Sequence, residues 1–127
     1  MEIAIQKLAV LAFLVIGLSH ILQSRLWAQF FIGLSEMGAI GSFISAFIHF
    51  PLGALVVAFH NVWKGIPLIL TLIGYSLVVK SLIYFLFPSV GLKSMQRVSL
   101  ERSWEFVLAG IAAVGISCLL AFALIHK

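Results

Sequence analysis

Charged side chains are scarce in this sequence. Aspartate, glutamate, lysine and arginine make up 9% of its 127 residues, while hydrophobic residues make up 63%. A soluble domain usually carries about a quarter charged residues, and a water-soluble chain of this length would leave large apolar patches exposed. The scarcity of charge therefore excludes an ordinary soluble fold and favours a protein that is dissolved in lipid.

Cysteine is almost absent as well. Cys118 is the only thiol, which excludes an intrachain disulfide, a CxxC pair and a thiolate metal cage. The eight lysines and arginines, set against four acids, are spread along the chain and do not form the basic patch that nucleic-acid binding requires. We expect neither a metal site nor a nucleic-acid partner.

The sequence does contain four long apolar segments. They run approximately over residues 3–22, 37–59, 66–87 and 103–125, and each approaches the roughly 20 residues that an α-helix needs to cross hydrocarbon. No small-residue cleavage site follows the first segment, so we expect a span and not a signal peptide. The sequence predicts an all-α, integral membrane four-helix bundle that forms a single transmembrane domain over residues 1–127.

The connections differ in character. Residues 23–35 mix polar and aromatic side chains and predict a short interfacial segment after the first helix. Residues 60–65 are too few for a domain, and the third connection starts at Pro88 and carries the densest charge. Positive charge is in slight excess beside the first and third connections, which predicts that they are cytoplasmic and that both termini are extracytoplasmic.

Small residues recur on two of the predicted spans. Close packing of small side chains supplies much of the association between helices in lipid. We therefore expect these two faces to point into the bundle or into a contact between subunits. The residues are Ala109, Ala113, Ser117 and Ala121 on the fourth span, and Gly38, Gly41, Ser42, Ser45, Ala46 and Gly53 on the second.

His49 lies near the middle of the second span, where a polar side chain is costly unless it has a partner. Ser45 and His60 fall on about the same helix face, and Pro51 removes a backbone hydrogen bond just beyond it. Two interpretations stay open. His49 either bonds a hydroxyl or carbonyl of another helix and stiffens the bundle, or the four residues contact a ligand, a proton or a cofactor.

Haem held by two histidines requires both ligands at one depth. Only His60 and His126 match in depth, and both are placed near water by the spans. Haem is therefore kept only as an alternative cofactor, beside a quinone.

A second polar cluster is predicted at the presumed cytoplasmic end. Lys80 stands about two turns inside the third span and could reach Glu105 near the start of the fourth. The cluster is either an ion-pair network that fixes helix order or a site for an anionic headgroup or substrate. Its members are His20, Arg25, Glu36, Lys80, Arg97 and Glu105.

Two stretches carry a resemblance to a known family. Residues 16–22 run into Arg25, Leu26 and Trp27, and residues 84–88, which end in Pro88, close the third span. In these stretches and in its order of spans, the chain resembles the DoxX-like group of small four-helix bacterial membrane proteins. The resemblance implies a bacterial inner membrane location, and some members of that group are linked to quinone-dependent sulfur oxidation. Small multidrug exporters are similar in size but rely on an acid in the first span, which residues 8–22 lack.

No catalytic triad, phosphate-binding loop or paired carboxylates can be recognised, so an enzyme is not the favoured class. The leading hypothesis is a non-catalytic bundle that associates with itself or acts as an accessory subunit of a larger membrane complex. The alternatives are a quinone- or haem-binding redox component and a small-solute transporter that uses the second helix and Lys80.

Overall fold

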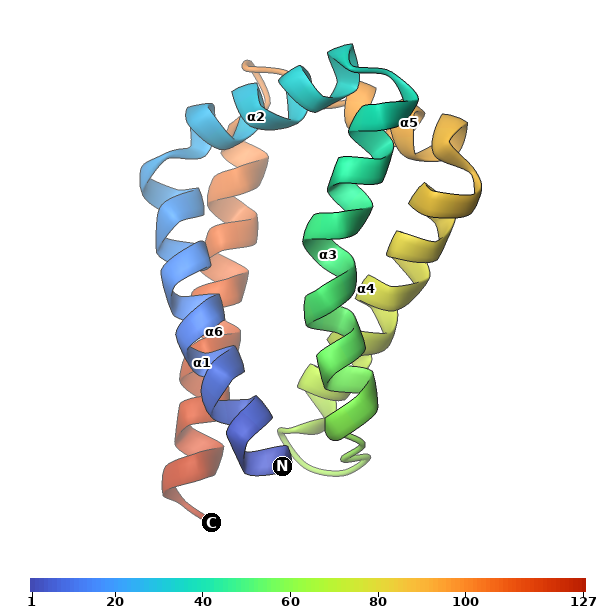
Figure 1. The fold of residues 1–127 in the computed structure, drawn as a ribbon. Helices are drawn as coiled ribbons and strands as arrows, with labels where there is room; N and C mark the ends of the chain where they lie inside the picture. Colours follow the sequence, from blue (N-terminus) through green and yellow to red (C-terminus); the bar gives the residue numbers. More distant parts are fainter.

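The computed structural model describes all residues from 1 to 127 and contains six α-helices. Four long helices run beside one another, and two short ones lie across one end of them (Figure 1). The fold is therefore all-α and a helical bundle, as predicted. The helices are α1 (Glu2–Leu22), α2 (Ser24–Glu36), α3 (Ala39–Phe59), α4 (Leu68–Leu86), α5 (Pro88–Gln96) and α6 (Trp104–Ile125).

The four long helices α1, α3, α4 and α6 are each long and apolar enough to cross a membrane. Their ends lie within two residues of the predicted spans. Many large hydrophobic side chains on them are exposed, which would be costly in water. Lipid removes that cost, and the chain is a multi-pass membrane protein.

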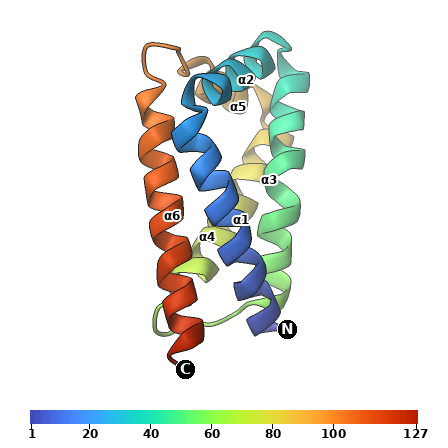
Figure 2. The ribbon, with the colours of Figure 1, turned by 90° about the vertical axis from the view of Figure 1, so that its left-hand side faces the viewer.

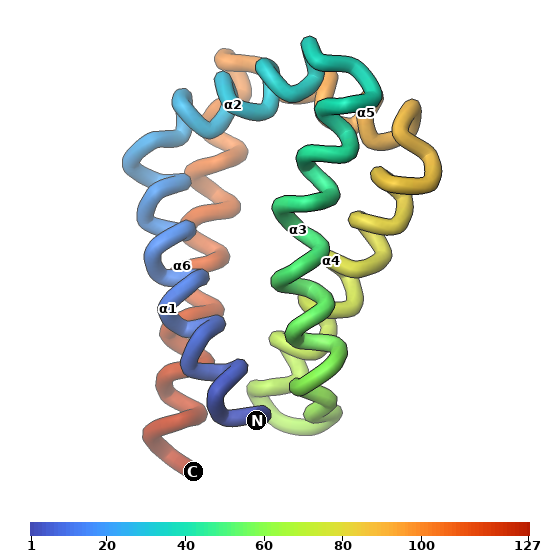
Figure 3. The backbone as a smooth tube through the Cα atoms, viewed as in Figure 1, coloured from blue at the N-terminus to red at the C-terminus, as the bar shows by residue number.

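The long helices are arranged as two antiparallel pairs. α1 packs along α6 and α3 packs along α4, while the two pairs touch each other over only a short stretch. Figure 2 shows α1 and α6 running side by side for most of their length. Figure 3 shows the N-terminus beside the connection between α3 and α4, at the end opposite α2 and α5. The pairs are thus joined mainly at their two ends.

Small residues on the spanning helices make close contacts between helices of the same chain. Gly53 of α3 faces Gly74 of α4 closely enough that a Cβ on Gly53 would lie 3.1 Å from the Gly74 carbonyl oxygen. The Ser117 hydroxyl on α6 donates a 2.7 Å hydrogen bond to the Val10 carbonyl oxygen on α1. Much of the small-residue surface predicted from the sequence therefore packs within each pair.

The connection that begins at Pro88 contains a helix that the sequence analysis did not predict. In α5, Pro88 occupies the first turn, where its missing N–H costs nothing. Gly91 lies so close to Ser42 and Tyr84 that a side chain there would collide with both. α5 therefore packs against α3 and α4, whereas the predicted interfacial segment forms α2.

Candidate functional site

His49 lies on α3, and its hydrogen-bond partner is one turn back on the same helix. Its Nδ1 is 2.7 Å from the Ser45 carbonyl oxygen, so Nδ1 carries the proton and donates it. The neutral ring therefore presents Nε2 as an acceptor, and Nε2 makes no hydrogen bond within the chain. The expected partner on another helix is absent because the carbonyl at position 45 is already within reach.

Lys80 on α4 is a cation in a spanning helix without an acidic partner. The Lys80 ammonium lies over the Tyr84 ring, whose centroid is 5.4 Å from Nζ. The expected contact with Glu105 is not formed, because Glu105 pairs with Arg102 at 2.7 Å. Lys80 is also the cation that acts electrostatically on His49. A charge inside a membrane is costly unless something neutralises or hydrates it, so Lys80 and His49 mark a candidate site.

The two other expected site residues on α3 are Ser45 and Pro51, and they lie in different surroundings. Ser45 is buried beside His49, whereas Pro51 is exposed on the outer surface of the bundle. Pro51 therefore does not contribute to a protein-facing site.

The polar cluster expected at the α2 and α5 end is not joined into an ionic network. Arg25, Glu36 and Arg97 are all exposed, and the only ion pair in the structure is the one between Arg102 and Glu105. These side chains form no ion pair with one another, so the predicted ion-pair network is not formed.

Aromatic rings hold that end together instead. His20 of α1 stacks on Trp27 of α2 at 4.2 Å, and Phe31 of α2 stacks on Phe106 of α6 at 5.8 Å. The His20 Nδ1 is 2.8 Å from the Ile16 carbonyl oxygen of its own helix. His20 thus belongs to a stack that fixes α2 against the α1 and α6 pair.

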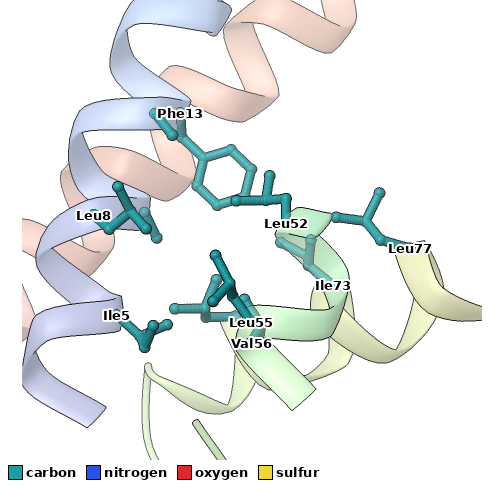
Figure 4. A pocket seen from close by; sticks show the side chains of 11 residues that line it. Ile5, Leu8, Phe13, Leu52, Leu55, Val56, Ile73 and Leu77 are labelled. Atoms are coloured by element: carbon teal, nitrogen blue, oxygen red, sulfur yellow. The ribbon is translucent and has the colours of Figure 1, made fainter. Parts of the chain in front are cut away.

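An apolar crevice lies between α1, α3 and α4 (Figure 4). All 11 residues that line it are hydrophobic, among them Phe13 of α1, Leu52 of α3 and Leu77 of α4. Leu52 stands three positions after His49, and Leu77 stands three positions before Lys80, which places each leucine on about the same face of its helix as the polar residue. The crevice therefore ends about one helical turn from the two polar side chains.

His60 forms a second polar site, which the sequence analysis placed near water. The structure buries it completely. Its Nε2 is 3.0 Å from the Gln6 Nε2 on α1, and its Nδ1 is 3.0 Å from the Thr71 Oγ1 on α4. Burial lowers the pKa of His60, more than Glu2 raises it. Because both ring nitrogens are occupied, His60 is not free to join His126 as a haem ligand.

Gln6 was missed by the sequence analysis. A glutamine within an apolar span is itself an unusual feature, and that signal could have indicated a buried polar contact. What the sequence could not reveal is its partner, which lies 54 positions further along the chain.

No group of three or more histidine, cysteine, aspartate or glutamate side chains is placed to hold a metal ion. No protein-family model matches the sequence, and comparisons with curated proteins and with solved structures found no match. The fold and these sites define a multi-pass helical membrane protein with polar side chains at two depths.

Proposed function

We propose that this protein binds a lipid-soluble molecule with a quinone-like head and an apolar tail, and that it does so without catalysing a reaction itself. The observation that carries the proposal is the position of Lys80 and His49. Both have a nitrogen without a hydrogen-bond partner in the chain, and both stand one turn from a wholly apolar crevice.

The two nitrogens have complementary hydrogen-bonding roles. The Lys80 ammonium donates, and the His49 Nε2 accepts because Nδ1 holds the proton. A quinone carbonyl can accept a hydrogen bond from the Lys80 ammonium. A quinol hydroxyl can donate a hydrogen bond to the His49 Nε2. The crevice has a volume of only about 10 Å³ and cannot enclose a tail, so we place the tail in the surrounding lipid. The wholly hydrophobic lining of the crevice offers a polar solute no partner. We therefore do not propose transport of a polar solute.

The test is the binding of a short-tailed quinone to protein purified in mild detergent, measured by calorimetry. We expect Lys80→Ala and His49→Ala each to weaken binding about tenfold, which corresponds to about 1.4 kcal/mol for one hydrogen bond. Lys64→Ala removes an exposed lysine from the connection between α3 and α4 and serves as the control. Unchanged affinity in both Lys80→Ala and His49→Ala would refute the proposal.

Association with a second subunit is a second candidate, and Gly115 favours it. The other spanning-helix glycines, at positions 17, 41, 53, 74 and 110, lie in close contact within the chain, but nothing lies within 4 Å of a Cβ built on Gly115. An exposed small residue on a spanning helix permits another helix to approach closely. Native mass spectrometry should show an oligomer that Gly115→Leu reduces and that Gly33→Leu, on exposed α2, leaves intact. A monomer in the parent protein would exclude self-association.

We also propose that the chain is DoxX-like and lies in a bacterial inner membrane with both termini outside the cytoplasm. The order of one span, a short helix across the bundle end and three further spans supports the resemblance. Exposed Arg25, Lys93 and Arg97 at the α2 and α5 end support the orientation. A periplasm-dependent phosphatase fused after Lys127 should be active, and the same fusion placed after Gln96 should be inactive. The reverse pattern would overturn the orientation.

A further inference from the structure

One polar network connects the two helix pairs at the end that carries the termini. Gln6 belongs to α1, His60 directly follows α3, and Thr71 belongs to α4. Each of the three is at most 2% exposed. At this end the N-terminal part of α1 lies beside the connection between α3 and α4 (Figures 1 and 3). Because the pairs touch each other over only a short stretch, the network is a specific tie between α1 and the α3 and α4 pair.

The hydrogen bonds determine which nitrogen of His60 carries the proton. The Thr71 hydroxyl donates to the Val62 carbonyl oxygen at 2.8 Å, so its oxygen is left to accept. His60 Nδ1–H donates to that oxygen at 3.0 Å. The remaining nitrogen, Nε2, then accepts from the Gln6 amide N–H at 3.0 Å. The network is consistent only with a neutral His60.

A second proton on His60 would break this pattern. Nε2 would become a donor facing another donor, the Gln6 amide nitrogen. Turning the amide would present Oε1, which is the one buried side-chain polar atom in the chain without a hydrogen-bond partner. The same turn would take both amide hydrogens away from their only acceptor. The turned amide gives the charged ring an acceptor, but it leaves the amide hydrogens unpaired and the positive charge sealed away from water, which is costly.

We infer that Gln6, His60 and Thr71 form a proton-sensitive latch. It holds α1 against the α3 and α4 pair while His60 is neutral, and it releases α1 when His60 takes up a proton and moves toward water. This inference is independent of the quinone proposal, since it involves neither His49 nor Lys80 and needs no ligand.

The charged groups around the latch do not neutralise a proton added to His60. α1 contributes Glu2 and the exposed Lys7, the connection between α3 and α4 contributes exposed Lys64, and the end of α6 contributes exposed His126 and Lys127. α4 carries no charged side chain near the latch. Glu2 favours the charged form of His60 but less than burial opposes it, so the pKa is lower in the closed latch than in an open one. Acidification therefore favours opening.

The test measures the separation of α1 and α4 in liposomes by pulsed electron spin resonance. Cys118→Ser removes the exposed native thiol, and Leu11→Cys with Leu72→Cys places spin labels on exposed positions of α1 and α4. We expect one narrow distance at about pH 8 and a longer, broader distribution at about pH 5, on either side of the ordinary histidine pKa. The change should reverse when the pH is restored.

Two variants identify the responsible groups. His60→Gln keeps a hydrogen-bonding side chain that does not titrate, so its distances should be the same at both pH values. Gln6→Glu supplies a carboxylate that pairs with the charged ring, so its latch should stay closed at the acidic pH. His126→Gln, at the same end, should respond like the parent. Unchanged distances in the parent, or a full response in His60→Gln, would overturn the inference.

Discussion

Gly17 of α1 and Gly110 of α6 cross so closely that neither position has room for a side chain. A Cβ on Gly17 would lie 2.9 Å from the Gly110 carbonyl oxygen, and a Cβ on Gly110 would lie 2.5 Å from the Gly17 carbonyl oxygen. The obstacle in both directions is backbone, which cannot turn aside as a flexible side chain can. The α1 and α6 pair is therefore fixed at this crossing.

Gly17→Ala and Gly110→Ala should each destabilise the protein by about 1–3 kcal/mol, because an added methyl group forces the helices apart. Unfolding by sodium dodecyl sulfate, followed by circular dichroism, measures the change. Gly115→Ala is the matched control, since a Cβ there meets open space and alanine favours a helix. Equal stability of all three variants would show that the crossing is not tight.

The spans could be predicted because their signal is local. About 20 apolar residues in a row have few structural solutions other than a membrane helix, and the predicted ends fall within two residues of α1, α3, α4 and α6. α5 could not be predicted in the same way. It is short, begins at a proline and depends on the contact of Gly91 with Tyr84 and with Ser42, and Ser42 is distant in sequence.

The candidate sites were predicted less completely. His49 and Lys80 could be selected because a polar side chain is conspicuous inside an apolar segment. His60 could not be recognised as buried, since it follows the end of α3 and becomes sealed only when Gln6 of α1 approaches it. The predicted contact between Lys80 and Glu105 was wrong for a related reason. Arg102 lies three positions before Glu105 on the same turn and reaches it more readily than Lys80 does.

The stability of the protein should depend on pH through His60. Burial lowers the pKa of His60 in the folded protein, so the unfolded chain takes up the proton more readily. The stability that neutral His60 contributes is fully present above the ordinary histidine pKa of about 6.5. It is lost as the pH falls toward the lower pKa of His60 in the folded protein. Thermal unfolding in detergent should show a melting temperature that is constant above neutral pH and declines below it. His60→Gln should remove that decline, whereas an unaltered decline would assign it to another group.

The Ser117 hydroxyl should contribute to the packing of α6 on α1. It donates a 2.7 Å hydrogen bond to the Val10 carbonyl oxygen across the helix pair. Ser117→Ala should cost about 0.5–1.5 kcal/mol in unfolding free energy. Ser76→Ala is the matched control because its hydroxyl bonds only the Leu72 carbonyl oxygen of its own helix. If both variants cost the same, the bond between helices adds no stability.

Trp27 should anchor α2 to the end of α1 through two separable contacts. Its indole N–H donates a 2.9 Å hydrogen bond to the Ser19 hydroxyl, and its ring stacks on His20 at 4.2 Å. Trp27→Phe removes the first contact and keeps an aromatic ring, whereas Trp27→Ala removes both. Amide hydrogen exchange in α2 should therefore quicken slightly in the first variant and strongly in the second. Trp104→Phe alters an exposed ring at the start of α6 and should leave α2 unchanged. Equal exchange in α2 for Trp27→Ala and the parent would mean that α2 is held by its contacts with α3, α5 and α6.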